Sequence, residues 1–257
     1  MFFTWMAPPG AELNLFGPYA RNERILVNEQ GLLQHQEFRR LICFRSKYDS
    51  PGMRRLLLDV ERVTQAQGFQ RFKHDNTTTV GITSRDGRKL VIKRYNTKNQ
   101  WHAFRRLLRR SRAQNCFEFA LTLQQLGVAT APPVAFVEER FGPLKGRSWL
   151  ITEFVEGPVC LDYIQESASS REAGEIAARL ERVFQKLAKA NITHGDMKAT
   201  NYILRNRREP VLLDLDAMTR HQNPARYATA HARDRARFMK NWQAKPDIKA
   251  CFSRVEW

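Results

Sequence analysis

The sequence is poor in the features that mark secreted, membrane-spanning or metal-binding proteins. It contains four cysteines in 257 residues, which are Cys43, Cys116, Cys160 and Cys251. Their wide spacing excludes a metal-binding pair and is typical of reduced thiols in a cytosolic protein. No run of about 18 apolar residues occurs, so no membrane-spanning helix is expected. The first nine residues lack a basic segment and a long apolar segment, which argues against a secretory signal peptide.

Acidic residues are also scarce compared with basic ones. The chain has 43 Lys and Arg against 26 Asp and Glu, which gives a formal net charge of +17 and a pI near 10.3. A surface of this kind attracts polyanions such as nucleic acid, anionic lipid headgroups or a phosphorylated glycan. No zinc-finger spacing, aromatic RNA-binding signature or basic-zipper heptad occurs, so nucleic acid is not the expected partner.

One stretch carries the densest set of chemistry-bearing side chains. Asp196 is followed by Lys198 and Asn201 on a short loop, and two apolar runs around a turn then predict a β-hairpin. This hairpin would bring Asp214 back beside Asn201. In phosphoryl transfer a carboxylate orients the acceptor hydroxyl, a cation meets charge on the moving phosphate, and oxygen ligands hold Mg²⁺. The set predicts an ATP-dependent kinase, with Asp196 and Lys198 as catalytic residues. Asn201 and Asp214 are then the expected Mg²⁺ ligands.

Residues 69–95 are predicted to form three antiparallel strands. Asp86-Gly87 between β-branched runs is a good hairpin signal. Lys93 ends a Val-Ile-Lys run, where the kinase pattern has the lysine that binds the α and β phosphates. A lone strand lysine is otherwise usually solvated. The segment 73–81 would cover the phosphates, with Gly81 as its one glycine where several are usual.

A long helical region is expected at 101–127. Residues 98–112 include five arginines and no acid. Such a basic helix lies on anionic headgroups, grips a phosphorylated ligand, or simply forms a solvated face. Glu118 is the acid of the following turns, and an ion pair from Glu118 to Lys93 would fix the lysine against the phosphates of ATP.

Strands at 133–137 and 148–154 would close a small sheet. The chain then passes through a predicted hinge, where backbone groups of Glu153 and Val155 would meet the adenine edge of ATP. Ser169-Ser170-Arg171-Glu172 matches a capping box and predicts the start of a helix that leads to the Asp196 loop.

These elements predict an α+β, two-lobed protein-kinase-like fold. A small antiparallel-sheet N-lobe with one main helix is expected at 53–155, and a mostly helical C-lobe at 156–257. Residues 1–52 show breakers and no sustained period, whereas Met53 opens the first regular element. We interpret 1–52 as an extension outside the core, either a flexible arm or an over-extended start with Met53 as the true first residue. An ordinary N-terminal subdomain is equally compatible with the pattern.

The chain resembles the bacterial lipopolysaccharide core kinases, the heptose and Kdo (3-deoxy-manno-octulosonic acid) kinases with a protein-kinase-like fold. The likeness covers residues 65–245. The motifs that carry it are Arg109-Arg110-Ser111-Arg112-Ala113, Glu118, 126–132, 151–157, 194–201, 214–217 and 233–242. It implies transfer of phosphate from ATP, with Mg²⁺, to a sugar hydroxyl (heptose or Kdo) of the lipopolysaccharide inner core. It also implies an acidic, lipid-linked oligosaccharide as partner, met by a cytoplasmic protein in peripheral contact with the anionic inner membrane.

Departures from protein kinases narrow the choice of acceptor. Gly195 stands where protein kinases have the Arg of His-Arg-Asp, and Asp214-Leu215-Asp216 replaces Asp-Phe-Gly. A small-substrate kinase is therefore favoured over a phosphorylation-switched protein kinase. The His-Gly-Asp variant also occurs in aminoglycoside and choline phosphotransferases, which usually lack a lysine at the position of Lys198. A protein kinase, a small-molecule phosphotransferase and a pseudokinase binding module remain the alternatives.

Overall fold

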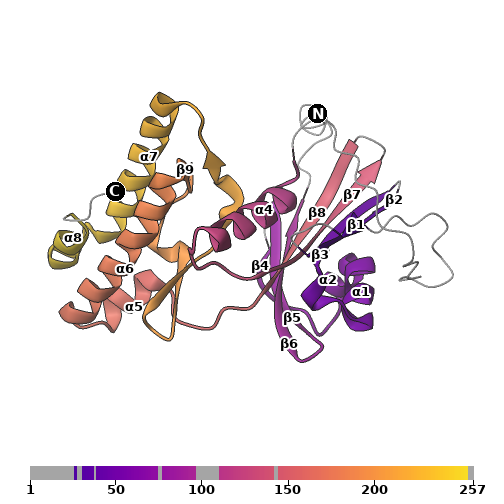
Figure 1. Cartoon of the computed structure of the whole chain (residues 1–257). Coiled ribbons are helices and arrows are strands. Elements are labelled where there is room, and N and C mark those ends of the chain that lie inside the picture. Colours follow the sequence, from indigo (N-terminus) through magenta and orange to yellow (C-terminus); the bar gives the residue numbers. More distant parts are fainter. Residues whose placement is uncertain are drawn as a thin grey trace. The chain divides into compact units, whose positions relative to one another are not determined.

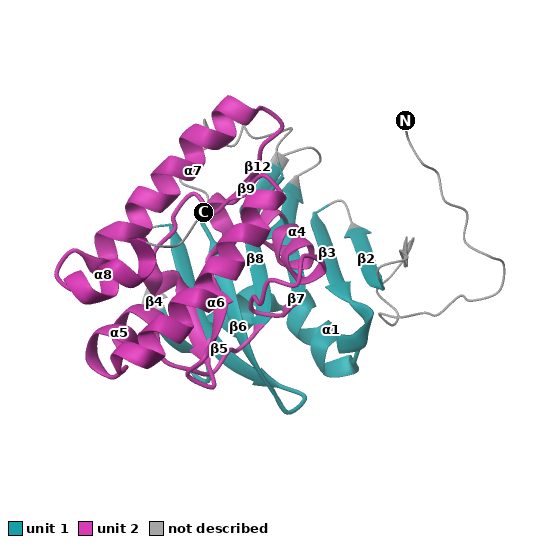
Figure 2. Ribbon diagram, turned by 60° about the vertical axis from the view of Figure 1, so that its left-hand side comes forward, with its two compact units in different colours: residues 1–114, 134–152 teal, residues 115–133, 153–257 magenta. Residues whose placement is uncertain are grey.

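The computed structural model combines an antiparallel sheet with helices and confirms the α+β class (Figure 1). It describes residues 26–27, 31–37, 39–74, 77–96, 110–141 and 144–253. The chain divides into two compact units (Figure 2). Unit 1 comprises residues up to 114 together with 134–152, and unit 2 comprises 115–133 and 153–257.

Unit 1 is built on one eight-stranded sheet. Its strands are β1 (Leu26–Val27), β2 (Leu32–Glu37), β3 (Arg40–Arg45), β4 (Gln70–His74), β5 (Thr78–Arg85), β6 (Arg88–Tyr95), β7 (Pro133–Phe141) and β8 (Leu144–Glu153). They lie in the order β1-β2-β3-β7-β8-β6-β5-β4. Strands β4, β5 and β6 pair antiparallel, as the sequence predicts. Asp86 and Gly87 form the turn between β5 and β6 with φ of 50° and 72°, which is the left-handed geometry that Asp-Gly favours.

The described part of the N-terminal region belongs to this sheet. Strand β3 pairs antiparallel with β7, from Arg40 opposite Glu139 to Phe44 opposite Ala135. The four residues between the ends of β3 are buried. Residues 32–48 therefore follow the subdomain alternative, in which this region is part of the folded domain.

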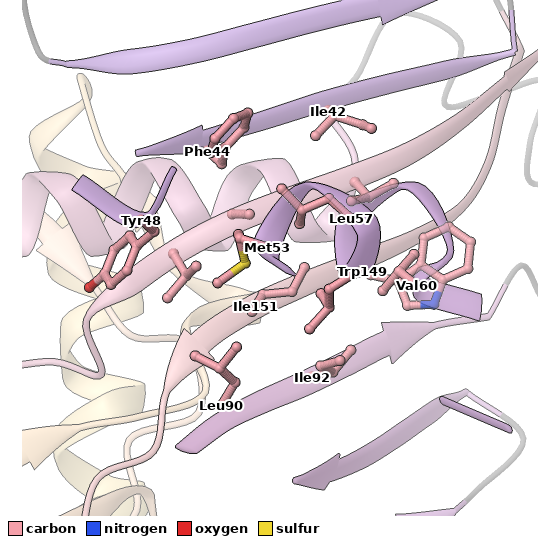
Figure 3. Close-up of a cluster of buried hydrophobic side chains, with 14 of the residues drawn as sticks. Ile42, Phe44, Tyr48, Met53, Leu57, Val60, Leu90, Ile92, Trp149 and Ile151 are labelled. Atoms are coloured by element: carbon pink, nitrogen blue, oxygen red, sulfur yellow. The ribbon is translucent and has the colours of Figure 1, made fainter. Parts of the chain in front are cut away.

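A helical pair packs on this sheet and completes the apolar core of unit 1. Helix α1 (Pro51–Leu58) begins at Ser50, whose side chain accepts a hydrogen bond from the Met53 amide at 3.0 Å. Helix α2 (Val60–Gln65) follows directly. Figure 3 shows side chains of this pair packed with Trp149, Ile151 and residues of β3 and β6 in one buried cluster. The regular element expected from Met53 is thus a helix that buries its apolar residues against the sheet.

Unit 2 is mostly helical. Its helices are α4 (Arg112–Gln125, grouped with unit 2 from residue 115), α5 (Cys160–Glu166), α6 (Ser170–Lys189), α7 (Pro224–Met239) and α8 (Pro246–Ser253). Its short strands are β9 (Ile192–Thr193), β10 (Tyr202–Arg205), β11 (Glu209–Leu212) and β12 (Thr219–Arg220). The capping box predicted at Ser169 is confirmed, since Ser169 and Glu172 bond to each other's backbone amides at the start of α6. The predicted β10–β11 hairpin is also confirmed.

An aromatic cluster holds the C-terminal elements of unit 2 on α6. Phe238 of α7 packs edge-to-face against Phe184 of α6, with ring centroids 5.1 Å apart. Trp242 stacks on Phe252 of α8 at 4.7 Å. These four rings are buried. Helix α7 is consequently fixed at its C-terminal end, which is the end that meets the candidate site.

Two expectations about organisation remain open. The compact units differ from the expected lobes because 115–133 and 153–155 group with unit 2 and the described residues before Met53 group with unit 1. Most of the basic segment 98–112 lies outside the described residues. Among the helices that the structure describes, none is long and apolar enough to cross a membrane.

Candidate active site

Asp196 lies on the loop that follows β9, between two cationic side chains. Lys198 Nζ lies 3.0 Å from Asp196 Oδ1 and 3.1 Å from Oδ2. Arg237, from α7, donates from Nη1 to Asp196 Oδ1 at 2.8 Å. The predicted pairing of an acid with a lysine two residues on is therefore present in the folded loop. Arg237 is a second cation that sequence reasoning did not single out.

The two cations determine the protonation of the Asp196 carboxyl. Partial burial by itself raises the pKa of this group. The hydrogen bond from Lys198 and the positive charges of Lys198 and Arg237 outweigh burial, so the net pKa of Asp196 is lowered. The carboxylate is consequently ionised at neutral pH, which is the form that accepts a hydrogen bond from an acceptor hydroxyl.

The predicted Mg²⁺ ligands lie at neighbouring ends of the hairpin. Asn201 donates from Nδ2 to the carbonyl oxygen of Asp196 at 2.8 Å, which leaves Asn201 Oδ1 to act as a ligand. The amide of Leu213 donates to the carbonyl of Asn201 at 2.8 Å, so Asp214 follows directly beside Asn201 in space. Asp214 is exposed and has left-handed backbone angles of φ 54° and ψ 62°. Carboxylate and amide oxygens suit Mg²⁺, which takes one or two protein ligands together with substrate phosphates.

This donor set fits a magnesium–nucleotide complex better than a metal held by the protein alone. Across the described residues, no group of three His, Cys, Asp or Glu side chains could hold a metal ion. A site with two oxygen ligands from the chain needs further oxygen from the phosphates of ATP. The residues present are therefore compatible with Mg²⁺ that arrives with its nucleotide.

His194 fastens the loop to the strand that precedes Asp214. Its ring is fully buried, and its Nε2 lies 3.0 Å from the carbonyl oxygen of Leu213. Because a carbonyl oxygen only accepts, Nε2 is the donor. The His194 side chain thus couples the position of the Asp196 loop to that of Asp214.

Asp234 of α7 holds the backbone of the same loop. Its Oδ2 accepts from the amides of His194 at 2.7 Å and Gly195 at 3.0 Å, and its Oδ1 accepts from Met197 at 3.4 Å. Only 3% of Asp234 is exposed. A buried carboxylate is stable here because backbone N–H groups satisfy it. Sequence reasoning missed this role, because nothing local to α7 shows that its one acid, Asp234, is buried against the loop.

Gly195 is required by the path of the loop. Its φ is +79°, and a Cβ built on it would lie 2.5 Å from the carbonyl oxygen of Ala217. Any larger side chain would meet both the strain of a left-handed backbone and this clash. The absence of the kinase arginine at this position is therefore a consequence of close backbone packing.

Helix α4 is tied to the segment after Asp214. Cys116 donates from Sγ to Asp216 Oδ1 at 2.9 Å. Glu118 lies two residues further along α4, within the same compact unit as Asp196 and Asp214. Sequence reasoning did not find the Cys116–Asp216 contact, since a lone cysteine gives no such signal.

The predicted phosphate-binding residues of unit 1 lie on its sheet. Lys93 is in β6, opposite Val80 of β5, and its Nζ lies 5.3 Å from the centre of the Tyr95 ring. Gly81 has a packing reason, because a Cβ there would lie 2.6 Å from the Gln70 carbonyl oxygen and also meet the Phe69 ring. Lys93 and Glu118 belong to different compact units, so their ion pair stays a prediction.

The predicted hinge borders a cavity within unit 2. Residues 153–158 and the turn 205–207 line a hollow of about 630 Å³, to which Pro132 also contributes. The Glu153 amide donates to the Pro132 carbonyl at 2.9 Å, which fixes the backbone at the start of this hinge. Asp196, Asn201 and Asp214 are not among the lining residues. The cavity is therefore separate from the Asp196 loop.

Comparison with known proteins identifies the family. Residues 59–250 match the family described as "Lipopolysaccharide kinase (Kdo/WaaP) family". The chain belongs to this family. The expected relation to the lipopolysaccharide core kinases is thereby confirmed, and membership makes the protein a kinase, that is a phosphotransferase, of lipopolysaccharide biosynthesis. A search of curated individual proteins gives no match.

Proposed function

We propose that the protein transfers the γ-phosphoryl group of ATP to a sugar hydroxyl, on heptose or Kdo, of the lipopolysaccharide inner core. Family membership supports a kinase that acts on lipopolysaccharide. The observation that carries the proposal is the ionised Asp196 carboxylate, held by Lys198 beside the oxygen ligands Asn201 and Asp214. This arrangement supplies a proton acceptor, a cation and a metal-binding edge on one exposed loop.

Each residue of this loop has a distinct task in the reaction. Asp196 orients the acceptor hydroxyl and takes its proton as the oxygen attacks the γ-phosphorus. Lys198, whose side chain is 47% exposed, is free to turn toward the phosphoryl group and to neutralise its charge. Asn201 and Asp214 would hold Mg²⁺, which supplies charge neutralisation of the phosphate oxygens when it is bound.

The nucleotide-binding roles remain as the sequence assigns them. Lys93, oriented by Glu118, positions the α and β phosphates, and the segment that ends at Gly81 covers them. Backbone groups of Glu153 and Val155 receive the adenine edge. In this proposal unit 1 is the N-lobe and unit 2 is the C-lobe of a kinase fold.

The acceptor determines where the protein works. An acidic, lipid-linked oligosaccharide suits a chain with a net charge of +17, because opposite charges attract at a membrane surface. We place the protein at the cytoplasmic face of the inner membrane, in peripheral contact with anionic lipid. Nucleic acid is not a proposed partner.

The test is transfer of labelled phosphate. Purified protein, ATP labelled at the γ position, Mg²⁺ and deacylated inner-core oligosaccharide should give a phosphorylated glycan that mass spectrometry detects. Asp196→Asn should lower the rate at least about 100-fold, since the proton acceptor is lost. Asp247→Asn on α8, an exposed acid outside the site, is the control and should retain the wild-type rate.

Two results would contradict the proposal. One is equal label transfer by the wild-type protein and the Asp196→Asn variant. The other is phosphorylation of a peptide, an aminoglycoside or choline in preference to core oligosaccharide. The His-Gly-Asp sequence around Gly195 makes the small-molecule acceptors the necessary comparison. Absence of Mg²⁺-dependent ATP binding would instead favour a pseudokinase.

A further inference from the structure

The two oxygens of the Asp196 carboxylate have unequal surroundings. Oδ1 accepts from Arg237 Nη1 at 2.8 Å and lies 3.0 Å from Lys198 Nζ. Among the described residues, Oδ2 receives a hydrogen bond only from Lys198, at 3.1 Å. The same Nη1 of Arg237 donates to the carbonyl oxygen of Gly195 at 2.7 Å. Arg237 thus grips the carboxylate and the adjoining backbone at once.

Helix α7 fixes the backbone position of Arg237. Arg237 is followed by Phe238, which is fully buried and packs against Phe184 and Trp242 with ring centroids 5.1 and 5.7 Å away. Three residues earlier, Asp234 binds the loop amides. Residues three apart lie on neighbouring turns of one helix face. One face of α7 therefore holds both the backbone and the reactive side chain of the loop.

We propose that Arg237 is a positioning residue for phosphoryl transfer, which holds Asp196 Oδ1 and the Gly195 carbonyl so that Oδ2 stays directed at the acceptor hydroxyl. This inference rests on the proposed function. When Lys198 turns toward the phosphoryl group, the carboxylate loses one of its two cationic partners. Arg237 then keeps its orientation, because its guanidinium remains anchored through α7.

The reaction balances with Oδ2 as the proton acceptor. The acceptor hydroxyl oxygen forms a bond to the γ-phosphorus, and the bond from that phosphorus to the β–γ bridging oxygen breaks. The hydroxyl proton passes to Asp196 Oδ2, and ADP leaves with the electron pair of the broken bond. Arg237 undergoes no covalent change and acts only through Asp196.

Three substitutions separate orientation from charge. Arg237→Ala removes both the hydrogen bonds and the charge. Arg237→Gln keeps an N–H donor without the charge. Arg235→Ala, at an exposed position of the same helix, removes an equal charge outside the observed loop contacts and serves as the control.

We expect Arg237→Ala to lower kcat between about 10-fold and 100-fold, as misplacement of a catalytic group does, while KM for ATP changes less than about twofold. Arg237→Gln should recover part of kcat. Arg235→Ala should match the wild-type protein in both kcat and KM. A loss in Arg235→Ala equal to that in Arg237→Ala would overturn the proposal, because general surface charge would then explain both.

A second readout does not depend on any acceptor. Crystal structures of the variants show the direction of the Asp196 carboxylate. This carboxylate should keep its wild-type orientation in Arg235→Ala and turn away from it in Arg237→Ala. An unchanged orientation and an unchanged kcat in Arg237→Ala would refute the inference. A wild-type protein without transferase activity, but with the expected displacement of Asp196 in Arg237→Ala, would refute only the proposed function.

Discussion

At the scale of single residues, the candidate site depends on the close packing of two backbone segments as much as on charged groups. Gly195 lies between the buried His194 and Asp196, the proposed proton acceptor, in a left-handed conformation and close to Ala217. Contacts on two sides fix the backbone of this loop. Asp234 accepts hydrogen bonds from its amides, and the Ala217 carbonyl oxygen leaves no room for a side chain at position 195. The orientation of Asp196 therefore depends on the backbone conformation of Gly195.

Replacement of this glycine should damage the site more than its small size suggests. Gly195→Ala introduces a Cβ 2.5 Å from the Ala217 carbonyl oxygen and a disfavoured φ of +79°. We expect the melting temperature to fall and kcat to drop at least about 10-fold, because the loop must shift to relieve the contact. Differential scanning fluorimetry and the phosphate-transfer assay measure the two effects.

Gly174→Ala on α6 is the control for that substitution. A Cβ at Gly174 would meet nothing within 4 Å, and alanine is the better helix former. This variant should be as stable as the wild-type protein or more stable. Full activity and an unchanged melting temperature in Gly195→Ala would show that the loop tolerates the contact.

The charge on Asp196 should also appear in stability measured against pH. The folded-state pKa of Asp196 is lowered below its ordinary value of 3.8. Its ionised form therefore stabilises the folded protein above that value, and the contribution is lost as the pH falls through the lower folded-state pKa. The difference in unfolding free energy between wild-type protein and Asp196→Asn should be constant above about pH 5 and move in favour of the variant below 3.8.

Urea unfolding of both proteins from pH 3 to pH 7 gives this difference directly. Other carboxylates titrate in the same range, but they cancel because both proteins share them. A difference that stays constant down to the lowest pH would mean that Lys198 and Arg237 do not favour the ionised form.

Sequence reasoning located the residues with a chemical signature and not those that only hold them. Asp196, Lys198, Asn201 and Asp214 stand at a spacing that phosphoryl transfer requires, so a motif reveals them. Asp234 acts through burial and through three distant amides. Its role exists only after α7 packs beside the loop, and a pattern confined to neighbouring residues does not contain that information.

At the scale of elements, α7 connects the buried aromatic cluster of unit 2 to the Asp196 loop. It carries Asp234 and Arg237 on one side, and Phe238 anchors it in the aromatic cluster. Helix α8 contributes Phe252 to the same cluster. A substitution that disrupts the packing of α8 should therefore displace α7 and, with it, the Asp196 loop.

Removal of a ring from this cluster should test that connection. Phe252→Ala deletes a fully buried ring that stacks on Trp242, and such changes cost about 3–5 kcal/mol. We expect a correspondingly lower unfolding free energy and a lower transfer rate at temperatures near the new melting point. Phe72→Ala on β4 removes a ring that is 63% exposed and should change stability by less than about 0.5 kcal/mol. Similar losses in both variants would argue against the cluster as an anchor.

Elements with strong local signals were predictable, and one region without them was not. The Asp-Gly turn at Asp86, the capping box at Ser169 and the β10–β11 hairpin each follow from local chemistry. Strands β2 and β3 do not. Strand β3 pairs with β7, a partner far along the chain, and β2 pairs in turn with β3. Turn-forming residues near these short strands also mask their pattern in the sequence.

At the scale of the whole molecule, the family match and the folded unit have different limits. The match begins at residue 59, whereas the unit 1 sheet includes β2 and β3 at 32–45. Residues of β3 also enter the buried cluster with α1 and Trp149. The segment before Met53 is therefore part of what keeps unit 1 folded.

A chain that starts at Met53 tests this conclusion. It would lack β3, leave β7 with an unpaired edge and remove Ile42 and Phe44 from the core. We expect aggregation or a much lower melting temperature, because exposed sheet edges and lost apolar burial both destabilise. A chain that starts at residue 26 keeps every described strand and is the control. Equal stability of the Met53 chain would restore the flexible-arm interpretation.

The pairing of β3 with β7 has a consequence for synthesis on the ribosome. Phe44 of β3 is synthesised before its pairing partner Ala135 of β7. At a synthesis rate of about 5–20 residues per second, the interval between them is on the order of ten seconds. During this interval the apolar residues of β3 have no strand to pair with on that side. Long-range pairings of this kind slow folding and expose nascent chains to aggregation. A chaperone that shields the emerging N-terminal strands should therefore improve the folding yield of unit 1.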